Sequence, residues 1–353
     1  MKIAIIGTDL GYMDGSVGAL EKLCLGWAEE LRQQGVNVCL LSIPPAKRIS
    51  VDPQNLLHFS NLADLNSQLD SIKPDVTISN NRPMWKLSGT FVKINIFHNY
   101  PDAWMIPATT SNREITETLS KCHNFAVSQA LADHVNQTYT SANTKVMYPF
   151  IGRPFIEKQV SVQPKNLHKP IKVLFPNRTL EKKGLRWVIQ AFEHNLNHLD
   201  RLTVVRNISP WDFQTQEHTQ LLDLAASKPF VQVVEKQVSI ESLISLYLDH
   251  DVVITPSIEA EGLGLIPLEA QASGLPVVTT NLGGLKESVF APNLAIEPYA
   301  EKAFVEAIEA VSRIDPKTRA EISDAVKKRF SPEISTKNLL DQIRILLNCN
   351  SLS

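Results

Sequence analysis

The amino-acid sequence alternates short apolar, β-branched segments with amphipathic helical segments. In the first half, apolar runs predict strands at residues 2–6, 36–43, 76–78, 92–97 and 125–127. Between the first two, Leu20, Leu23, Trp27 and Leu31 recur at steps of three and four residues, which indicates one face of a helix. Strands that alternate with helices are typical of a parallel sheet covered on both faces. The first half therefore predicts a doubly wound α/β domain.

The alternation stops between residues 152 and 170 and then starts again. That segment is polar, is rich in proline and has no sustained period, as is typical of an interdomain linker. Beyond it, strands are predicted at residues 171–175, 202–205, 231–234, 252–254 and 275–279. Near the end, Ser331-Pro332 has the pattern of a helix cap. We predict domains at residues 1–155 and 171–330, a linker at 156–170, and a C-terminal helix at 331–353 that could pack back on the first domain. The expected fold class is α/β, with two doubly wound parallel-sheet domains facing across a cleft.

Composition excludes several functional classes. Lys and Arg (35) nearly balance Asp and Glu (37), so the net charge is -2 and no broad basic field for nucleic acid is expected. No apolar run is long enough to span a bilayer, and the first residues lack the pattern of a secretory signal. The four cysteines have neither metal-site spacing nor the density of a disulfide framework. We predict a cytoplasmic protein with buried or incidental thiols, and peripheral membrane contact stays open.

The most informative segment spans residues 256–278, directly after a predicted strand. Gly262 and Gly264 form a Gly-x-Gly loop, and a helix is predicted to begin near Pro267. Glycines let backbone N–H groups approach a ligand closely. The N-terminus of a helix adds unpaired donors and a positive dipole end, which suit a phosphate group.

This segment resembles the retaining nucleotide-sugar glycosyltransferases often called group 1 or family 4, which have the GT-B fold of two Rossmann-like domains. The likeness rests on Glu261 and Glu269 in the frame Glu-Gly-x-Gly-Leu-x-Pro-Leu-Glu-Ala, and on the segments 273–278 and 283–287. It implies that Glu261 contacts the donor sugar and that Glu269 binds the ribose. It also implies donor contacts from Gly262, Leu263, Gly264 and Leu265.

A second match lies upstream, at Arg178 and Lys183-Gly184. The family has an arginine there, followed five residues later by a lysine–glycine pair. A diphosphate leaving group gains negative charge as the glycosidic bond breaks, so fixed cations stabilise the transition state more than the ground state. Each residue alone would be interpreted as a surface charge. Together they are expected to bind the donor diphosphate and to take part in catalysis.

The first half resembles the family less closely. The family often has a histidine at a strand end that faces the transferred sugar, which makes His98 a catalytic candidate. The turn around Gly15 is either a glycine loop near the donor phosphate or an ordinary strand-to-helix turn. Val238 is expected in the region that binds the base, where the family uses mainly backbone contacts, so the sequence does not identify the base.

Some exposed-looking groups have two interpretations. Trp85 and residues 104–106 are interpreted as loop anchors packed on the first domain, with an acceptor platform or lipid contact as the alternative. Arg82, Lys86 and Lys93 are interpreted as a solvated face, with anionic lipid as the alternative.

The sequence predicts retaining transfer of a sugar from a nucleoside diphosphate sugar to a hydroxyl of a glycan, a glycolipid or a small molecule. No metal or other cofactor is expected. The segment 249–251 looks like an Asp-x-Asp metal motif, but it lies between a helix end and a strand start and is interpreted as structural. The first turn lacks a Gly-x-Gly-x-x-Gly fingerprint, which argues against a nicotinamide enzyme. The alternatives are a nucleotide-sugar hydrolase or epimerase, and a non-catalytic donor-binding subunit.

Overall fold

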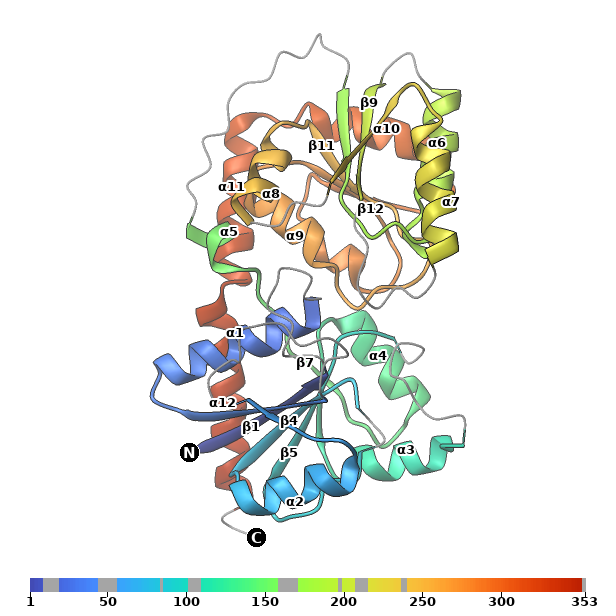
Figure 1. Ribbon diagram of the computed structural model, residues 1–353. Coiled ribbons are helices and arrows are strands. Elements are labelled where there is room, and N and C mark those ends of the chain that lie inside the picture. Colours follow the sequence, from blue (N-terminus) through green and yellow to red (C-terminus); the bar gives the residue numbers. More distant parts are fainter. Residues whose placement is uncertain are drawn as a thin grey trace. The chain divides into compact units, whose positions relative to one another are not determined.

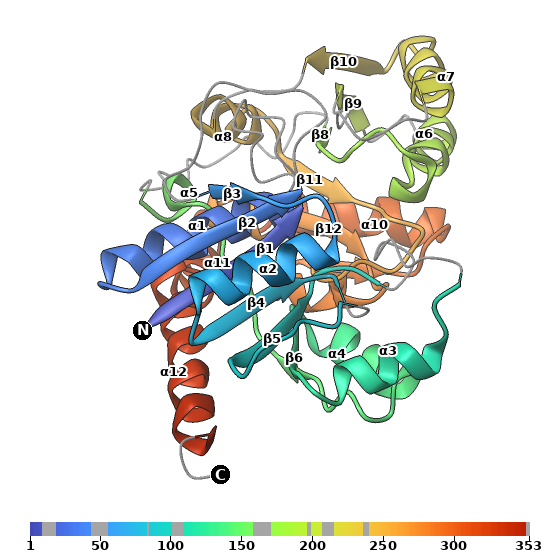
Figure 2. The ribbon, with the colours of Figure 1, turned by 60° about the horizontal axis from the view of Figure 1, so that its bottom comes forward.

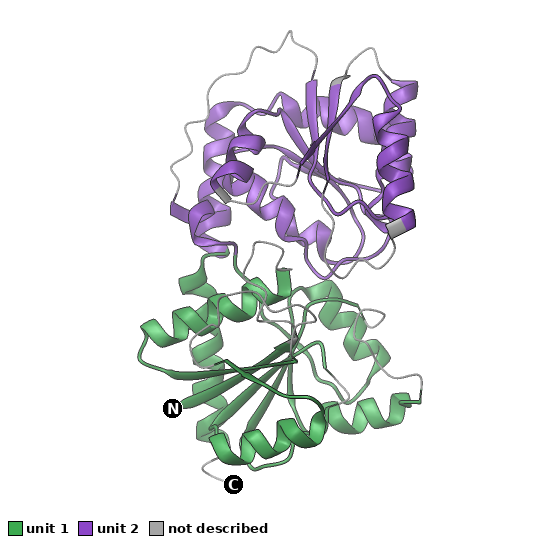
Figure 3. Cartoon of the chain, viewed as in Figure 1, with its two compact units in different colours: residues 1–150, 330–353 green, residues 151–329 purple. Residues whose placement is uncertain are grey.

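The chain contains two compact units. The computed structural model describes residues 1–8, 19–43, 56–82, 85–100, 109–157, 171–195, 199–206, 215–235 and 240–350. Unit 1 comprises residues 1–150 and 330–353, and unit 2 comprises residues 151–329 (Figure 3). Each unit is built around one parallel β-sheet.

Unit 1 contains a seven-stranded sheet in the order β3-β2-β1-β4-β5-β6-β7, with every neighbouring pair parallel (Figure 1). Its strands are β1 (Lys2–Thr8), β2 (Asn37–Ile43), β3 (Leu56–His58), β4 (Val76–Asn80), β5 (Val92–Phe97), β6 (His123–Ala126) and β7 (Lys145–Val146). Ile3 and Ile6 and the two residues between them are fully buried. A strand that is apolar on both sides needs cover on both faces, which explains the central place of β1.

Helices cover both faces of this sheet (Figure 2). They are α1 (Ala19–Gln33), α2 (Leu62–Ile72), α3 (Asn112–Leu119), α4 (Gln129–Thr138) and α12 (Pro332–Asn350). The predicted apolar stripe of α1 is buried at Leu23, Trp27 and Leu31, and the helix packs on β1, β2 and α12. α2 covers the other face, where Leu65 and Leu69 join a core cluster with alternate residues of β1.

The C-terminal helix α12 belongs to unit 1, although it follows unit 2 in the chain. Ser331 caps it as the sequence predicts, because its Oγ accepts from the Ile334 amide at 3.2 Å. Trp27 Nε1 donates to Ser335 Oγ at 3.1 Å, and that hydroxyl donates to the Tyr148 carbonyl at 3.1 Å. These two bonds attach the first turn of α12 to α1 and to the segment after β7.

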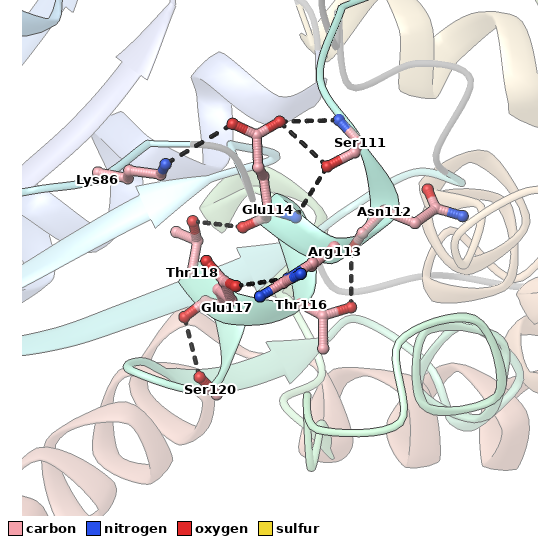
Figure 4. Close-up of polar contacts among 9 residues, drawn as sticks. All are labelled: Lys86, Ser111, Asn112, Arg113, Glu114, Thr116, Glu117, Thr118 and Ser120. Carbon is pink, nitrogen blue, oxygen red and sulfur yellow. Dashed lines mark hydrogen bonds and ion pairs between the residues drawn. The ribbon is translucent and has the colours of Figure 1, made fainter.

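Helix α3 begins with a capping box (Figure 4). Ser111 Oγ accepts from the Glu114 amide, and Glu114 Oε2 accepts from the Ser111 amide at 2.9 Å. Lys86 pairs with the same glutamate at 3.8 Å.

The prediction that Arg82, Lys86 and Lys93 form a solvated face is wrong at Arg82. That residue is only 6% exposed, and its guanidinium lies 5.4 Å from the centre of the Trp85 ring.

Trp85 packs against core residues of unit 1, with its ring 5.7 Å from that of Phe59. It is therefore a loop anchor in this structure. Residues 104–106, which share that interpretation, lie outside the described part of the chain.

Unit 2 contains a six-stranded parallel sheet in the order β10-β9-β8-β11-β12-β13. Its strands are β8 (Ile171–Phe175), β9 (Leu199–Arg206), β10 (Val231–Glu235), β11 (Val252–Thr255), β12 (Val277–Thr280) and β13 (Leu294–Ile296). Its helices are α5 (Arg153–Glu157), α6 (Leu185–His194), α7 (Thr215–Ala226), α8 (Ile240–Leu248), α9 (Leu265–Ala272), α10 (Glu301–Ser312) and α11 (Pro316–Arg329), with 3-10 turns η2 (Glu181–Lys183) and η3 (Gly284–Ser288). Among the described helices of both units, none combines the length and the apolar character that a membrane crossing requires.

The two sheets share one winding pattern, which confirms the predicted doubly wound α/β class. In unit 2 the chain runs from β8 outward to β9 and β10, and then returns to place β11 on the other side of β8. Such a reversal creates a switch point, and ligands of doubly wound sheets bind there, beyond the carboxyl ends of the strands. The switch point of unit 2 lies between β8 and β11.

Local boundaries differ from the predictions in a few places. α9 begins at Leu265, so the predicted start near Pro267 is two residues late. β12 begins at Val277, two residues after the predicted start of that strand. The short strands β3, β7 and β13 were not predicted, because their apolar runs are too short to show a period.

Candidate functional site

Two loops meet at the switch point of unit 2. One connects β8 to α6, and the other connects β11 to α9. Asn177 Nδ2 donates to the Ile254 carbonyl at 3.1 Å. Further along, the Ile258 amide donates to the Lys182 carbonyl at 2.9 Å. The first loop is therefore hydrogen-bonded near its start to β11 and near its end to the first part of the second loop.

Gly184 lets the start of α6 press against the second loop. Its φ is +82°, and a Cβ at this position would lie 2.0 Å from the Pro256 carbonyl oxygen. The same oxygen accepts from Trp187 Nε1 at 3.1 Å. An L side chain is disfavoured by the backbone conformation and excluded by the contact. The glycine of the Lys183-Gly184 pair is thus required by packing.

Lys183 and Glu261 form an ion pair at this junction. Lys183 Nζ lies 2.8 Å from Glu261 Oε1, and the side chains are 15% and 22% exposed. The Ser257 hydroxyl donates to the same carboxylate. Burial acts to raise the pKa of Glu261, but Lys183, the hydrogen bond from Ser257 and the positive charge of Arg178 outweigh it and lower the pKa. Glu261 is therefore an anion at neutral pH.

Ser257 is a site residue that the sequence motif did not single out. It is 1% exposed, and its carbonyl accepts from Thr280 Oγ1 at 2.6 Å. On the other side, the Glu261 carbonyl accepts from the Gly284 amide at 2.8 Å. The carboxylate is thereby positioned from β11 and from the end of β12. Ser257 stands four residues before the motif glutamate, but the single sequence did not indicate this contact.

The N-terminus of α9 lies directly after this carboxylate in the chain. Gly264 is the residue before the helix, has φ +89°, and supplies no side-chain cap. The first amides of a helix have no partner within it. Leu265 and Ile266 occupy the first two positions, and Pro267 has no amide hydrogen to offer. This end of α9 can therefore receive an anion.

Glu269 projects from the middle of α9 and is half-buried. Burial raises the pKa of the Tyr247 hydroxyl on α8 well above its ordinary value, and the negative charge of Glu269 raises it further. The carboxylate therefore lies beside this tyrosine. The structure thus gathers Arg178, Lys183 and Glu261 at the loop junction, and Glu269 lies on α9, the helix that follows the second loop. Gly15 and Val238 lie outside the described residues.

His98 occupies the corresponding edge of unit 1, directly after β5. It is 8% exposed, its Nε2 lies 2.9 Å from Asn80 Oδ1, and its amide donates to Asn81 Oδ1 at 2.7 Å. Asn80 Nδ2 donates to the Ile6 carbonyl at 3.0 Å, so Asn80 Oδ1 is an acceptor and His98 Nε2 carries the ring proton. His98 Nδ1 is then an acceptor that has no partner among the described residues. The sequence predictions missed both asparagines.

The titration of His98 gives the first testable prediction. Burial lowers its pKa from 6.5 to about 3. The unfolded chain therefore binds a proton below about pH 6.5 that the folded chain excludes, so the free energy of unfolding falls as the pH falls through this range. We expect this one group to contribute a loss of about 1.4 kcal/mol per pH unit well below that value. Urea unfolding at about pH 7 and about pH 5 measures it.

The variant His98→Gln should lose this part of the pH dependence. His58→Gln, which changes an exposed histidine of β3, is the matched control and should keep it. Equal pH dependence in all three proteins would show that the buried ring does not exclude its proton.

The segment 249–251 is occupied by structural contacts. His250 Nδ1 donates to the Leu246 carbonyl and Nε2 accepts from Thr203 Oγ1, both at 2.7 Å. Asp251 Oδ2 accepts from the Lys172 amide at 2.9 Å. These bonds connect the end of α8 and the start of β11 to β8 and β9.

Comparison with known proteins places unit 2 in a family. Residues 157–329 match the family model described as glycosyl transferases group 1. A D-inositol 3-phosphate glycosyltransferase of Corynebacterium urealyticum is 36% identical over 110 residues, which cover 30% of this chain and 26% of that protein. The matching stretch thus spans about a quarter of that relative's length.

Solved structures resemble the chain over nearly its whole length. Sucrose-phosphate synthase from Thermosynechococcus elongatus has a TM-score of 0.79 and 17% identity, and the likeness covers 99% of both chains. HepE of Anabaena, in complex with UDP-glucose, has a TM-score of 0.69 and 16% identity, over 99% of this chain and 100% of that one. At such identities the likeness shows the fold alone. The match over residues 157–329 places unit 2 of this chain among the glycosyl transferases of group 1.

Proposed function

We propose that this protein transfers a sugar from a nucleoside diphosphate sugar to an acceptor hydroxyl with retention of the anomeric configuration. The observation that carries the proposal is the Lys183–Glu261 ion pair next to the uncapped N-terminus of α9. A cation and unpaired amides suit a diphosphate, and a fixed carboxylate suits sugar hydroxyls. These groups lie at the switch point, where doubly wound sheets bind their ligands.

In the proposed mechanism, the Lys183–Glu261 ion pair exists before the donor binds, and the donor then replaces Glu261 as the partner of the lysine. The donor diphosphate binds to Arg178 and Lys183 and competes with Glu261 for the lysine. Glu261 then accepts hydrogen bonds from the sugar, while Glu269 accepts from the ribose. As the glycosidic bond breaks, negative charge grows on the diphosphate, and the two cations stabilise it. The acceptor hydroxyl attacks from the face of the departing phosphate, and a phosphate oxygen takes its proton.

For His98 the proposal is a hydrogen bond to the transferred sugar. The support comes from unit 1 itself, where the ring lies at the carboxyl edge of the sheet and Nδ1 is an unpartnered acceptor within the described residues. A neutral ring with that tautomer accepts from a sugar hydroxyl. It does not serve as a charged acid, because its pKa is about 3.

The test is a thermal-shift panel with UDP, GDP, ADP and CDP, followed by their sugars. Because HepE of Anabaena was solved in complex with UDP-glucose, the uridine nucleotides are tested first. A ligand that binds only the folded protein stabilises it by about 2.7 kcal/mol at a hundredfold excess over its dissociation constant. We expect one nucleotide to give a clear shift, with its sugar conjugate acting at least as strongly.

Arg178→Ala should lose the shift, because it removes a diphosphate contact. Arg186→Ala is the matched control, since that arginine lies in the next element and pairs with Glu181 at the surface. No shift with any nucleotide would contradict the proposed donor site, whereas a shift without turnover would favour the alternative of a non-catalytic donor-binding subunit. Rapid release of free sugar without an acceptor would favour a hydrolase.

A further inference from the structure

A cavity opens in unit 1, at the opposite edge of the sheet from His98. Its volume is about 290 Å³, and it lies between the starts of β6 and β7 and the helix α12. His123 and Lys145 are the first residues of these two strands, whereas His98 follows the last residue of β5. Because the strands are parallel, the cavity is at their amino ends. It is therefore separate from the edge that carries the predicted site residues.

The electrostatic character of this cavity is positive. Lys145 and His123 both line it, and the lining residues include neither Asp nor Glu within the described part of unit 1. Burial lowers the pKa of His123, and the charge of Lys145 lowers it further, so the two groups share one space. The lowered pKa leaves His123 neutral at neutral pH, where its ring can still donate a hydrogen bond. Besides Lys145, a second cation, Lys93, lies close enough to act on the Cys122 thiol of the same lining. An anion that entered would meet cations without an acidic competitor in the described lining.

The remaining lining is mostly polar and uncharged. Ser141, Asn143 and Gln342 supply a hydroxyl and two amides that can bind ligand hydroxyls. The buried Asn124 connects two lining segments of the cavity, because its Nδ2 donates to the Ala142 carbonyl at 2.6 Å. The volume is close to the lower end of the range of about 300–1,000 Å³ typical of small-molecule pockets. Lining and size favour a small ligand with several hydroxyl groups.

We infer that this cavity binds a small phosphorylated polyol, such as a sugar monophosphate. Its phosphate would contact Lys145 and His123, and its hydroxyls would contact the neutral polar groups. Gln342 of the lining belongs to α12, the helix whose first turn receives the hydrogen bond from Trp27. The Trp27 ring lies 6.0 Å from that of His98. A bound ligand would therefore stabilise the helix that supports the packing around His98, and this inference does not rest on the proposed transfer activity.

Cys122 provides a direct reporter, because it lines the cavity and is partly exposed. Cys24 and Cys39 are buried, and Cys349→Ser removes the exposed thiol. The experiment measures the rate of Cys122 alkylation in the full chain carrying Cys349→Ser, with glucose 6-phosphate as the probe. We expect glucose 6-phosphate to slow the labelling severalfold and to raise the melting temperature. Inorganic phosphate, glucose and sodium chloride at matched ionic strength should have clearly smaller effects.

Lys145→Gln should abolish both effects of glucose 6-phosphate. Lys121→Gln is the matched control, since it removes an equal charge beside Cys122 from a residue outside the lining, and it should leave both effects intact. Unchanged labelling in glucose 6-phosphate would overturn the inference. Equal protection by inorganic phosphate would overturn the polyol part, and equal protection by glucose or sodium chloride would overturn the anion site. Protection that survives in Lys145→Gln would show that the ligand binds elsewhere.

Discussion

Replacing Glu261 with glutamine is expected to lower the rate of nucleoside diphosphate release from the donor sugar by a factor of about 10² to 10³. Glutamine keeps the size of the side chain and removes its charge. The proposed mechanism needs the carboxylate to orient the sugar as the bond to the diphosphate breaks. The assay uses the donor that the thermal-shift panel identifies, with wild-type protein measured in parallel.

The affinity for free nucleotide should not fall with the rate in this variant. In the wild-type protein Glu261 holds Lys183 at 2.8 Å, so a diphosphate must compete for the lysine. In Glu261→Gln that competition weakens, and the dissociation constant for the free nucleotide should stay equal or decrease. The variant should also be less stable without ligand, because Lys183 is mostly buried and loses its counter-charge. Lost turnover with retained binding separates this role from a general loss of structure.

Glu259→Gln is the matched control for this variant. Glu259 lies on the same loop but is exposed, so its replacement should change neither turnover nor nucleotide affinity. Full activity in Glu261→Gln would exclude the proposed role of the carboxylate. Loss of both turnover and nucleotide binding would instead assign Glu261 to the structure of the loop junction.

The sequence predicted the parts of the site that depend on spacing along the chain. Arg178, Lys183 and Glu261 come from two separate motifs, and the structure brings them to the carboxyl ends of β8 and β11. The doubly wound class was predictable for a similar reason, because strand and helix periods alternate over long stretches. The buried central strands carry that signal most clearly, as the residues from Ile3 to Ile6 show.

The predictions missed residues whose roles depend on contacts between distant segments. Ser257 contacts Glu261 and Thr280, and only the pairing of β11 with β12 brings that threonine near. Asn80 fixes the tautomer of His98 because β4 pairs with β5. A single sequence gives no signal for such pairs. The prediction of a solvated face was wrong at Arg82 for a related reason, since a long apolar stem can be buried while its charge finds local partners.

Gly184→Ala is expected to lower the free energy of unfolding of unit 2 by about 4 kcal/mol. Two costs combine at this position. Alanine at φ +82° is strained, and its Cβ would lie 2.0 Å from the Pro256 carbonyl oxygen, which is backbone and also accepts from Trp187. Relief requires the two loops at the switch point to separate, which would also displace Lys183 from Glu261. Urea unfolding followed by circular dichroism measures the loss.

Gly264→Ala is the matched comparison within the same unit. Its φ is +89° and its ψ is 99°, outside the left-handed region that Gly184 occupies, so its backbone strain is at least as large, but the nearest atom to a Cβ would be Leu285 Cδ2 at 2.7 Å. The end of a leucine side chain can rotate away, whereas a strand-end carbonyl cannot, so the expected loss is only about 1–2 kcal/mol. A larger loss in Gly184→Ala than in Gly264→Ala therefore reports the backbone contact at Pro256. Equal losses would mean that strain alone accounts for both, and that the loops at the switch point are less tightly joined than the 2.0 Å approach requires.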